Sequence, residues 1–498
     1  MSKIAIIGSG FSGLSAACYL ASVGHDVHVF EKNETAGGRA RQFISDNGYV
    51  FDMGPSWYWM PDVFERFFGD FGHTVSDFYD LKLLSPSFDV VFPENETISV
   101  PENYSELNSL FESIEEGSSV QLERFMKEAQ FKYDTGMGKL VYKPGLSILE
   151  FADPDLIKGA LRLQVFSSFS SHVRKYFSNP KLIALMEFPV LFLGAMPQDT
   201  PALYSLMNYA GLKLGTWYPK GGFAKVIEAI IDLAKSHGAK FHFNSAVERI
   251  IVEKDKVRSI SVKSSEIVVD AVIASADYHH VEDKLIPASH RNYSEKYWEK
   301  KTFAPSCLIF YLGLNKKIDK LNHHTLFFEE DLLDHSKEIY KNPKWPVKPL
   351  FYVCCPSKSD DSLAPEGHEN LFLLMPIAPG LEDGEELRET YFRIMIQRLE
   401  KQIGEEIYEF IDFKRSYCVS NFVEDYNSYK GNAYGLANTL RQTAVLKPCI
   451  RNKKIGNLFY AGQLTVPGPG VPPALISGKI VAETLHRHLN KKVHEDSI

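Results

Sequence analysis

The sequence predicts an α/β protein built from domains that interleave along the chain. Its 498 residues exceed what one hydrophobic core usually organises, which favours at least two domains. The chain opens with a strand–helix–strand pattern, and α/β patterning returns after residue 215 and near the C-terminus. No internal repeat or low-complexity linker separates these parts. We therefore expect one α/β domain to be assembled from separated segments.

The opening elements follow from short apolar runs. Lys3 to Gly8 is predicted as a strand, Phe11 to Val23 as a helix and Val27 to Glu31 as a second strand. From about Glu65 to Gly215 the pattern becomes mainly helical, and Ser118 to Asp134 and Asp155 to Phe177 are the longest expected helices. This region is predicted to be a helical insertion.

A second α/β stretch begins with a helix at Ala224 to His237. The expected strands from there to the end are Lys240–Phe243, Val247–Glu253, Lys256–Val262, Val268–Ser275, Cys307–Leu314, Leu350–Cys354, Asn370–Met375 and Asn457–Ala461. A final helix is expected to begin near Pro473. We predict that residues 1–75, 216–285 and 431–498 form the first domain, residues 76–215 the helical insertion, and residues 286–430 a mixed α+β domain.

A glycine-rich turn lies between the first strand and the first helix. Gly8-Ser9-Gly10-Phe11-Ser12-Gly13 has the pattern G-x-G-x-x-G, in which Gly8 permits a tight turn and Gly10 lets the backbone approach a pyrophosphate. Gly13 allows the helix to pack closely on the strand, and the helix N-terminus offers N–H groups to phosphate. Glu31, at the end of the second strand, is placed to accept hydrogen bonds from a ribose, with Lys32 beside it. The pattern predicts a Rossmann-type dinucleotide-binding domain.

A second glycine pair follows this turn. Gly37-Gly38-Arg39 permits another close backbone approach at Gly38, and Arg39 can supply a fixed cation to a pyrophosphate. The run from Gly8 to Arg39 resembles the FAD-binding signature of the amine-oxidase and carotenoid-desaturase superfamily.

Further segments resemble this superfamily in the expected order along nearly the whole chain. The segments that resemble FAD-contacting segments of the family are Phe51–Ser56, Asn244–Val247, Ser275–Asp277, Phe459–Thr465 and Pro467–Pro473. The resemblance implies that the contacts within them are made by Gly54, Pro55, Ser56, Val247, Asp277, Gly462, Val471 and Pro472. A further segment, Trp217–Gly222, resembles the return of the chain into the cofactor domain. The last two FAD-contacting segments look like the closing motif of bacterial and fungal phytoene desaturases. This motif directs a helix N-terminus towards the flavin, where it would stabilise the negative charge of the reduced ring.

Apolar segments suggest the substrate. Trp57-Tyr58-Trp59-Met60 follows Gly54 closely, and Phe188–Gly194 and Asn432–Gly435 resemble family segments that border the substrate. The resemblance implies FAD-dependent desaturation of a linear C40 carotenoid precursor, phytoene towards lycopene, by hydride transfer to flavin N5. A hydroxycarotenoid 3,4-desaturase or another carotenoid oxidase is the alternative. A flavin amine oxidase and a prenyl-protein-binding chaperone of the GDP-dissociation-inhibitor type are further alternatives.

The catalytic base has weak candidates only. Bacterial relatives carry an arginine–aspartate pair early in the helical insertion, and the nearest acidic residues here are Glu150 and Asp153. No arginine lies close to Glu150, so both carboxylates are also interpreted as solvated or helix-capping groups. The electron acceptor is expected to be oxygen or a quinone.

Composition limits the partners. A net charge of −8 and a pI near 6.1 provide no basic field for nucleic acid. The six cysteines show no C-x-x-C pair and no metal-ligand spacing with histidine, so no metal site is expected.

The N-terminus and the most apolar stretch of the chain predict where the protein resides. The first strand begins at Lys3, which leaves no room for a targeting peptide, so a cytoplasmic protein is expected. Leu182 to Ala195 is the most apolar stretch and is interpreted either as a buried helix or as a segment that dips into a membrane. Because a C40 hydrocarbon must enter from lipid, we expect peripheral attachment to a membrane surface.

Overall fold

The first domain is built on a five-stranded parallel sheet. The protein is described here by a computed structural model that covers residues 1–151, 163–164, 167–439 and 441–495. The sheet order is β19-β13-β1-β2-β9 and every neighbouring pair is parallel. Its strands are β1 (Lys3–Ile7), β2 (Asp26–Phe30), β9 (Lys240–His242), β13 (Ala271–Ala274) and β19 (Leu458–Tyr460). Segments from three distant parts of the chain therefore share one sheet, as the patterning predicts.

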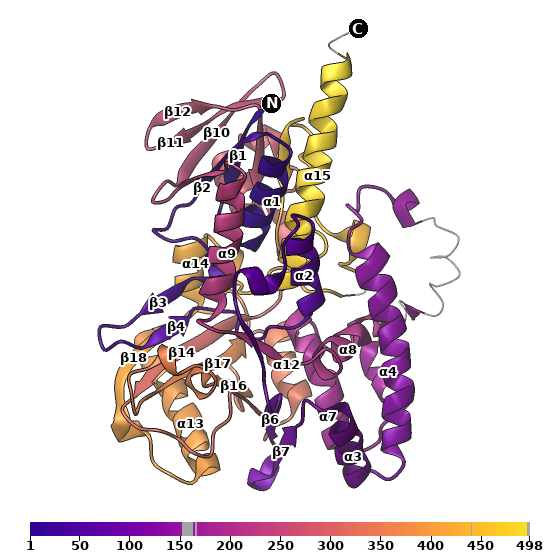
Figure 1. Cartoon of the computed structure of the whole chain (residues 1–498), viewed down its shortest axis with the longest axis vertical. Coiled ribbons are helices and arrows are strands. Elements are labelled where there is room, and N and C mark those ends of the chain that lie inside the picture. The colour runs from indigo at the N-terminus through magenta and orange to yellow at the C-terminus, as the bar shows by residue number, and fades with distance from the viewer. Residues whose placement is uncertain (152–162, 165–166, 440, 496–498) are drawn as a thin grey trace.

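Helices cover one face of this sheet and an antiparallel sheet covers the other. Helix α1 (Phe11–Ser22) packs between α9 (Phe223–Ser236) and α15 (Val471–Glu495), and these helices lie side by side in Figure 1. The opposite face shares a core with the antiparallel sheet β10 (Val247–Glu253), β11 (Lys256–Val262) and β12 (Ser265–Val268). Strand β13 is apolar throughout and β1 is apolar after Lys3, because both faces of these strands are buried.

One predicted strand is in fact two. The apolar run Val268–Ser275 is divided between β12 and β13, which belong to different sheets. The chain turns at Asp270, whose backbone N–H donates to the Lys3 carbonyl at 2.8 Å. The prediction of one strand over Val268–Ser275 was therefore wrong, because it ran across the turn at Asp270 and joined the end of β12 to β13.

The second sheet has seven strands in the order β18-β14-β17-β16-β15-β6-β7. Its strands are β6 (Phe88–Val91), β7 (Thr97–Val100), β14 (Ser306–Leu314), β15 (His324–Phe327), β16 (Phe351–Cys354), β17 (Glu369–Ile377) and β18 (Ile411–Tyr417). Helix α13 (Glu385–Ile403) packs on one face, and α12 (Leu332–Tyr340) lies beside β17. The other face turns towards the parallel sheet (Figure 1).

The prediction that residues 76–215 form a helical insertion was wrong at its start. Strand β6 pairs in parallel with β15, and β7 pairs with β6, so both belong to the seven-stranded sheet. Strand β5 (Leu81–Leu83) pairs with β8 (Trp217–Pro219). All four residues of β6 are buried, and so it lacks the alternation that would have marked it as a strand.

The helical part begins after β7. It contains α3 (Tyr104–Ile114), α4 (Ser118–Thr135), α6 (Phe169–Val173), α7 (Pro180–Glu187) and α8 (Leu206–Leu212). The predicted helix Asp155–Phe177 lies partly outside the described residues, and its described part includes α6. Among the helices of the ranges given above, none is both long and apolar enough to cross a membrane.

The stretch Leu182–Ala195 forms α7 followed by a 3-10 turn at Phe188–Leu193. Leu182, Met186, Phe188 and Val190 are at most 1% exposed. Most of the described side chains of this stretch are therefore buried, which favours the first of its two interpretations, a buried helix.

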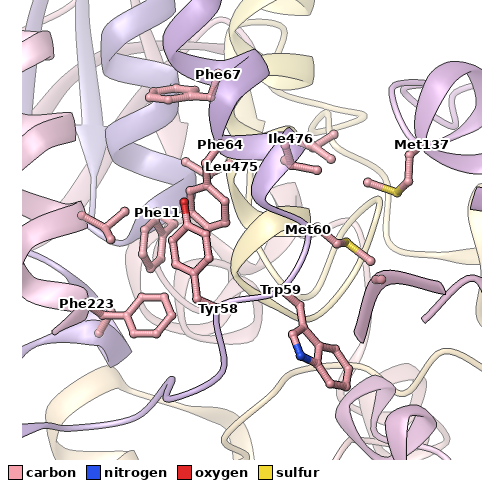
Figure 2. Close-up of a cluster of buried hydrophobic side chains, with 14 of the residues drawn as sticks. Phe11, Tyr58, Trp59, Met60, Phe64, Phe67, Met137, Phe223, Leu475 and Ile476 are labelled. Carbon is pink, nitrogen blue, oxygen red and sulfur yellow. The ribbon is translucent and has the colours of Figure 1, made fainter. Parts of the chain in front are cut away.

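An aromatic cluster joins the helices of the first domain to the segment after Gly54. Tyr58 stacks on Phe64 of α2 (Pro61–Gly69) with ring centroids 4.2 Å apart. Figure 2 shows these rings beside Phe11, Phe223 and Leu475, which come from α1, α9 and α15. Trp59 points away from this cluster in the same view. The cluster thus fixes Tyr58 in the core, whereas Trp57 and Trp59 line the neighbouring cavity.

Candidate active site

One cavity of about 730 Å³ lies between the parallel sheet and the seven-stranded sheet. Of the residues predicted to bind the cofactor, all except Gly13 line it: Gly8, Ser9, Gly10, Phe11, Ser12, Glu31, Lys32, Gly38, Arg39, Gly54, Pro55, Ser56, Val247, Asp277, Gly462, Val471 and Pro472. Most of them come from the ends of strands β1, β2, β13 and β19 and the segments that follow them, whereas Gly54 to Ser56 follow the short strand Val50–Asp52 and Val247 begins β10. In parallel sheets, ligands bind at the carboxyl ends of the strands, which is where this cavity opens.

The turn after β1 has the geometry that its three glycines predict. Gly8 has a φ of +96°, which favours glycine, and its N–H donates to the Phe30 carbonyl at 2.8 Å. A Cβ at Gly10 would meet nothing within 4 Å, so its backbone faces open space. A Cβ at Gly13 would lie 2.1 Å from the Gly8 carbonyl oxygen. Gly13 therefore packs behind the cavity wall rather than lining it.

Glu31 lies at the cavity edge with its carboxylate already engaged. Its Oε2 accepts from the Ser9 N–H at 3.0 Å and the Ser9 hydroxyl at 2.8 Å. Its Oε1 accepts from the Asn33 N–H at 2.9 Å and the Asn33 side-chain amide at 3.0 Å. A ribose hydroxyl would have to share or replace one of these donors. Lys32 donates to the Glu424 carbonyl, which holds its ammonium at the same edge.

Arg39 is a buried cation on the cavity wall. One terminal nitrogen donates to the Ser428 hydroxyl at 3.0 Å and to the Asn432 carbonyl at 3.2 Å. The guanidinium lies over the Tyr426 ring, 5.0 Å from its centroid. Burial lowers the pKa of Arg39, and the nearby Tyr426 and Asp277 oppose that effect. The buried Nε has no hydrogen-bond partner among the described residues, which leaves a donor for an anionic ligand.

Two further turns complete the polar end of the cavity. A Cβ at Gly54 would lie 2.5 Å from the Arg39 carbonyl oxygen, so this position admits only glycine without movement. Gly462 and Gly470 both have a φ of +112°. Helix α15 begins at Val471, directly after Gly470, so its N-terminus faces the cavity. The positive end of this helix favours negative charge in that place.

Asp277 and Val247 border the far part of the same end. Asp277 follows β13, and its carboxylate accepts from the backbone N–H groups of His280 at 3.2 Å and Tyr429 at 3.3 Å. Burial raises the pKa of Asp277, while these two N–H groups lower it. Val247, the first residue of β10, is 8% exposed.

These groups fit a dinucleotide that carries a pyrophosphate. The Gly10 backbone is open, two helix N-termini face the cavity, and the Arg39 Nε lacks a partner. Backbone N–H groups, a guanidinium and helix dipoles are the groups that recognise phosphate in proteins.

The rest of the cavity is an arm with apolar walls. It is lined by Trp57, Trp59, Met60, Phe188, Leu191, Met207, Cys307, Ile309, Leu326, Phe328, Ile339, Leu350, Tyr352, Leu374 and Tyr434. Trp59 is held by a hydrogen bond from its indole N–H to the Thr216 hydroxyl at 2.9 Å. Tyr352 and Leu374 face each other across β16 and β17, so both side chains enter the arm from one sheet face. The apolar arm thus continues directly from the polar end at Ser56.

In the part of the chain that the structure describes, neither of the two predicted catalytic bases lies in the cavity. Glu150 does not line the cavity; its carboxylate accepts from the N–H groups of Gly145, Leu146 and Ser147 at 2.8 to 3.1 Å. In this structure its carboxylate therefore holds a loop outside the cavity. Asp153 lies outside the described residues.

Several residues that line the cavity or contact its lining residues were not predicted. Ser428 and Tyr426 hold Arg39, and Tyr352 places a hydroxyl in the arm, 3.0 Å from the Ser56 hydroxyl to which it donates. Strands β14, β16 and β17 were expected from the sequence, but β15, which contributes Leu326, and the cavity-facing positions of all four strands were not. All four residues of Phe351–Cys354 are buried, so no alternation in polarity indicates which side chains face the cavity.

Comparison with known families defines the class of protein. A family model described as flavin-containing amine oxidoreductase matches residues 11–486. The fold agrees: an oxidoreductase structure from Methanosarcina mazei superposes with a TM-score of 0.60 at 17% identity, over 97% of this chain and 100% of that one. The cofactor is therefore FAD, as the sequence predicts, and the polar end of the cavity has the groups to receive it.

Relatives at higher identity narrow the assignment. A carotenoid 3,4-desaturase from Haloarcula japonica is 41% identical over 97% of both chains. A zeta-carotene-forming phytoene desaturase from Myxococcus xanthus is 30% identical over 97% of this chain and 93% of its own length. The chain belongs to the carotenoid desaturases of the flavin-containing amine oxidoreductase family. This confirms the family resemblance found in the sequence.

Proposed function

We propose that the protein is an FAD-dependent desaturase that acts on a long carotenoid chain, with 3,4-desaturation as its first candidate reaction. The observation that supports this most is the continuous cavity, in which the dinucleotide end opens directly into an apolar arm. The 41% identity to a carotenoid 3,4-desaturase favours that reaction over the desaturation of phytoene, to whose desaturase the identity is 30%.

FAD is proposed to bind at the polar end of the cavity. The groups proposed to hold it are the glycine turns, Glu31, Arg39 and the N-terminus of α15. FAD, when bound, supplies the acceptor for a hydride taken from a C–H bond of the substrate. The Arg39 guanidinium and the α15 helix end would stabilise the negative charge that reduction creates. Phe188, Leu326 and Leu374 would hold the polyene chain and exclude water from it.

The residues of the arm also bear on the competing activities. The acidic residues that line the cavity in the described part of the chain, Glu31, Glu248, Asp277 and Asp425, all belong to its dinucleotide end. An amine would find no carboxylate in the arm among these described residues, which disfavours amine oxidation. The open turn at Gly10 and the unpartnered Arg39 Nε suit a bound cofactor, which disfavours a flavin-free chaperone.

Membrane attachment is part of the proposal, but its site changes. Most of the described side chains of Leu182–Ala195 are buried, so this stretch is no longer the site that we favour. Leu146 and Leu149 are 41% and 79% exposed on the edge of the helical part, and they are the apolar side chains that we propose to touch lipid. Oxygen or a quinone remains the proposed electron acceptor, to be separated by anaerobic turnover with and without an added quinone.

The test is expression in hosts that accumulate defined carotenoids, followed by pigment chromatography. One host should supply phytoene, and a second should supply an acyclic hydroxycarotenoid with a saturated 3,4 bond. We expect a product with one more double bond in the second host. New pigment in the phytoene host alone would support the phytoene reaction instead, and unchanged pigments in both hosts would contradict desaturation.

A further inference from the structure

A buried cluster of two histidines and one cysteine lies behind the wall of the apolar arm. His324 in β15 and Cys354 in β16 are directly opposite in the antiparallel pair, so their side chains project to the same face. His323 precedes β15, and its ring meets the His324 ring edge-on with centroids 4.4 Å apart. One metal-ligating atom from each of the three residues lies within 4.8 Å of the others. All three side chains are at most 5% exposed.

Each imidazole is oriented by a hydrogen bond between one of its ring nitrogens and a neighbouring hydroxyl group. His323 Nδ1 is 2.7 Å from the Ser359 hydroxyl, and His324 Nδ1 is 2.6 Å from the Tyr352 hydroxyl. Both Nε2 atoms are buried and have no hydrogen-bond partner in the described part of the chain. A buried polar atom without a partner is energetically unfavourable, so a ligand at this place would stabilise the pair of rings. Metal-binding histidines show this arrangement, because the second nitrogen is fixed by a hydrogen bond while the first binds the ion.

We propose that His323, His324 and Cys354 bind one d10 metal ion, either Zn²⁺ or Cu⁺. Two imidazoles and one thiolate are ligands that both ions accept, whereas Mg²⁺ and Ca²⁺ prefer oxygen. Binding forms one metal–sulfur bond, breaks the S–H bond of Cys354 and releases one proton, with no change of oxidation state. The sequence predicted no metal site because these residues show no ligand spacing; strand pairing brings them together.

An ion at this site would organise the cavity wall. With His324 Nε2 bound to metal, Nδ1 must carry the proton and donate to Tyr352, which then donates to Ser56. Trp57, which lines the arm, stacks on the His324 ring with centroids 4.1 Å apart and the planes 9° apart. The ion would therefore position Tyr352 and Trp57 without touching the substrate. This inference does not depend on which substrate the protein desaturates.

The first test is the metal content of the purified flavoprotein, prepared without a polyhistidine tag. The protein is incubated with Zn²⁺, or with Cu⁺ under a reductant, and separated from free metal before elemental analysis. Cys354→Ser is compared with Cys355→Ser, which changes the neighbouring buried thiol that contacts Ser357 and Glu369 instead. We expect about one ion per chain in the wild type and in C355S, and under about a tenth of that in C354S.

X-ray absorption at the zinc and copper edges identifies the ion and its ligands. One sulfur at about 2.3 Å and nitrogen at about 2.0 Å from zinc would support the site. His323→Asn serves as a second variant should C354S fail to fold, and it should lower the metal content equally. Less than about a tenth of an ion per chain in the wild type after both incubations would overturn the proposal, as would full retention in either folded ligand variant.

Discussion

The Cα of Gly13 lies so close to the Gly8 carbonyl oxygen that a Cβ at position 13 would approach it to 2.1 Å. Helix α1 therefore packs on the end of β1 at a distance that only glycine permits. This contact sets the position of the turn from Gly8 to Gly10, which opens towards the cavity.

Gly13→Ala should push α1 away from β1 and reduce FAD binding more than tenfold. The cost of such overpacking is about 1–3 kcal/mol or more, and it falls on the turn that faces the cofactor. The measurement is the ratio of flavin to protein absorbance after purification, together with the melting temperature. Gly69→Ala is the control, because a Cβ there meets nothing within 4 Å. A normal flavin content in G13A would contradict the proposed role of the turn.

Arg39→Lys should weaken FAD binding by about tenfold or more, because a lysine keeps the charge but loses the planar fork that reaches several acceptors. The Ser428 hydroxyl and the Asn432 carbonyl would lose their shared donor. Titration of the deflavinated protein with FAD, followed by flavin fluorescence, gives the dissociation constant. Arg393→Lys, at a side chain that is 64% exposed, should leave it unchanged. Equal affinity of R39K and wild type would remove Arg39 from the proposed site.

Leu374→Trp should block the apolar arm while FAD remains bound. Leu374 points into the cavity, and its neighbours Leu373 and Met375 pack on the opposite side of β17. We expect desaturation to fall at least about tenfold at unchanged flavin content, since the added ring occupies the path of the chain. Pigment formation per flavin is the readout. Wild-type turnover in L374W would show that the substrate lies elsewhere.

Glu150→Gln should leave desaturation per bound flavin within about twofold of the wild type. Its carboxylate accepts three backbone N–H groups in the loop from Gly145 to Ser147, and a loop cap of this kind contributes about 1 kcal/mol to local stability. We therefore expect faster proteolysis near this loop and no loss of turnover. A hundredfold loss of turnover in E150Q would restore Glu150 as a catalytic group.

Glu282→Gln tests a buried carboxyl group through the pH dependence of stability. Burial raises the pKa of Glu282 from 4.5 to about 7, although the N–H groups of Asn292 and Tyr293 oppose this. The unfolded chain releases this proton near its ordinary pKa and the folded protein only near pH 7. The free energy of unfolding should therefore fall as the pH rises through this window, by up to about 3 kcal/mol.

E282Q should lack that part of the fall, because glutamine does not titrate. Denaturant unfolding between pH 4.5 and 7 measures the difference between the two proteins. Parallel curves for E282Q and wild type would show that Glu282 is ionised in the folded state throughout.

By itself, the sequence determined the dinucleotide end of the cavity. Gly8, Gly10 and Gly13 act through backbone geometry within one short turn, so their spacing alone carries the information. Gly54 and the turn at Gly462 were expected there from the resemblance to the family, and both line the same cavity. These local signals also predicted the strands that converge there, although the sheet draws them from distant parts of the chain.

The tertiary structure alone decided the apolar arm, the place of Glu150 and the His323–His324–Cys354 cluster. Strand β6 joins β15 through a pairing between residues far apart in the chain, and His324 meets Cys354 across two strands. Fully buried strands lose the alternation that would indicate which side chains share a face. The partners of a buried side chain are set by strand register and packing, which no short stretch of sequence contains.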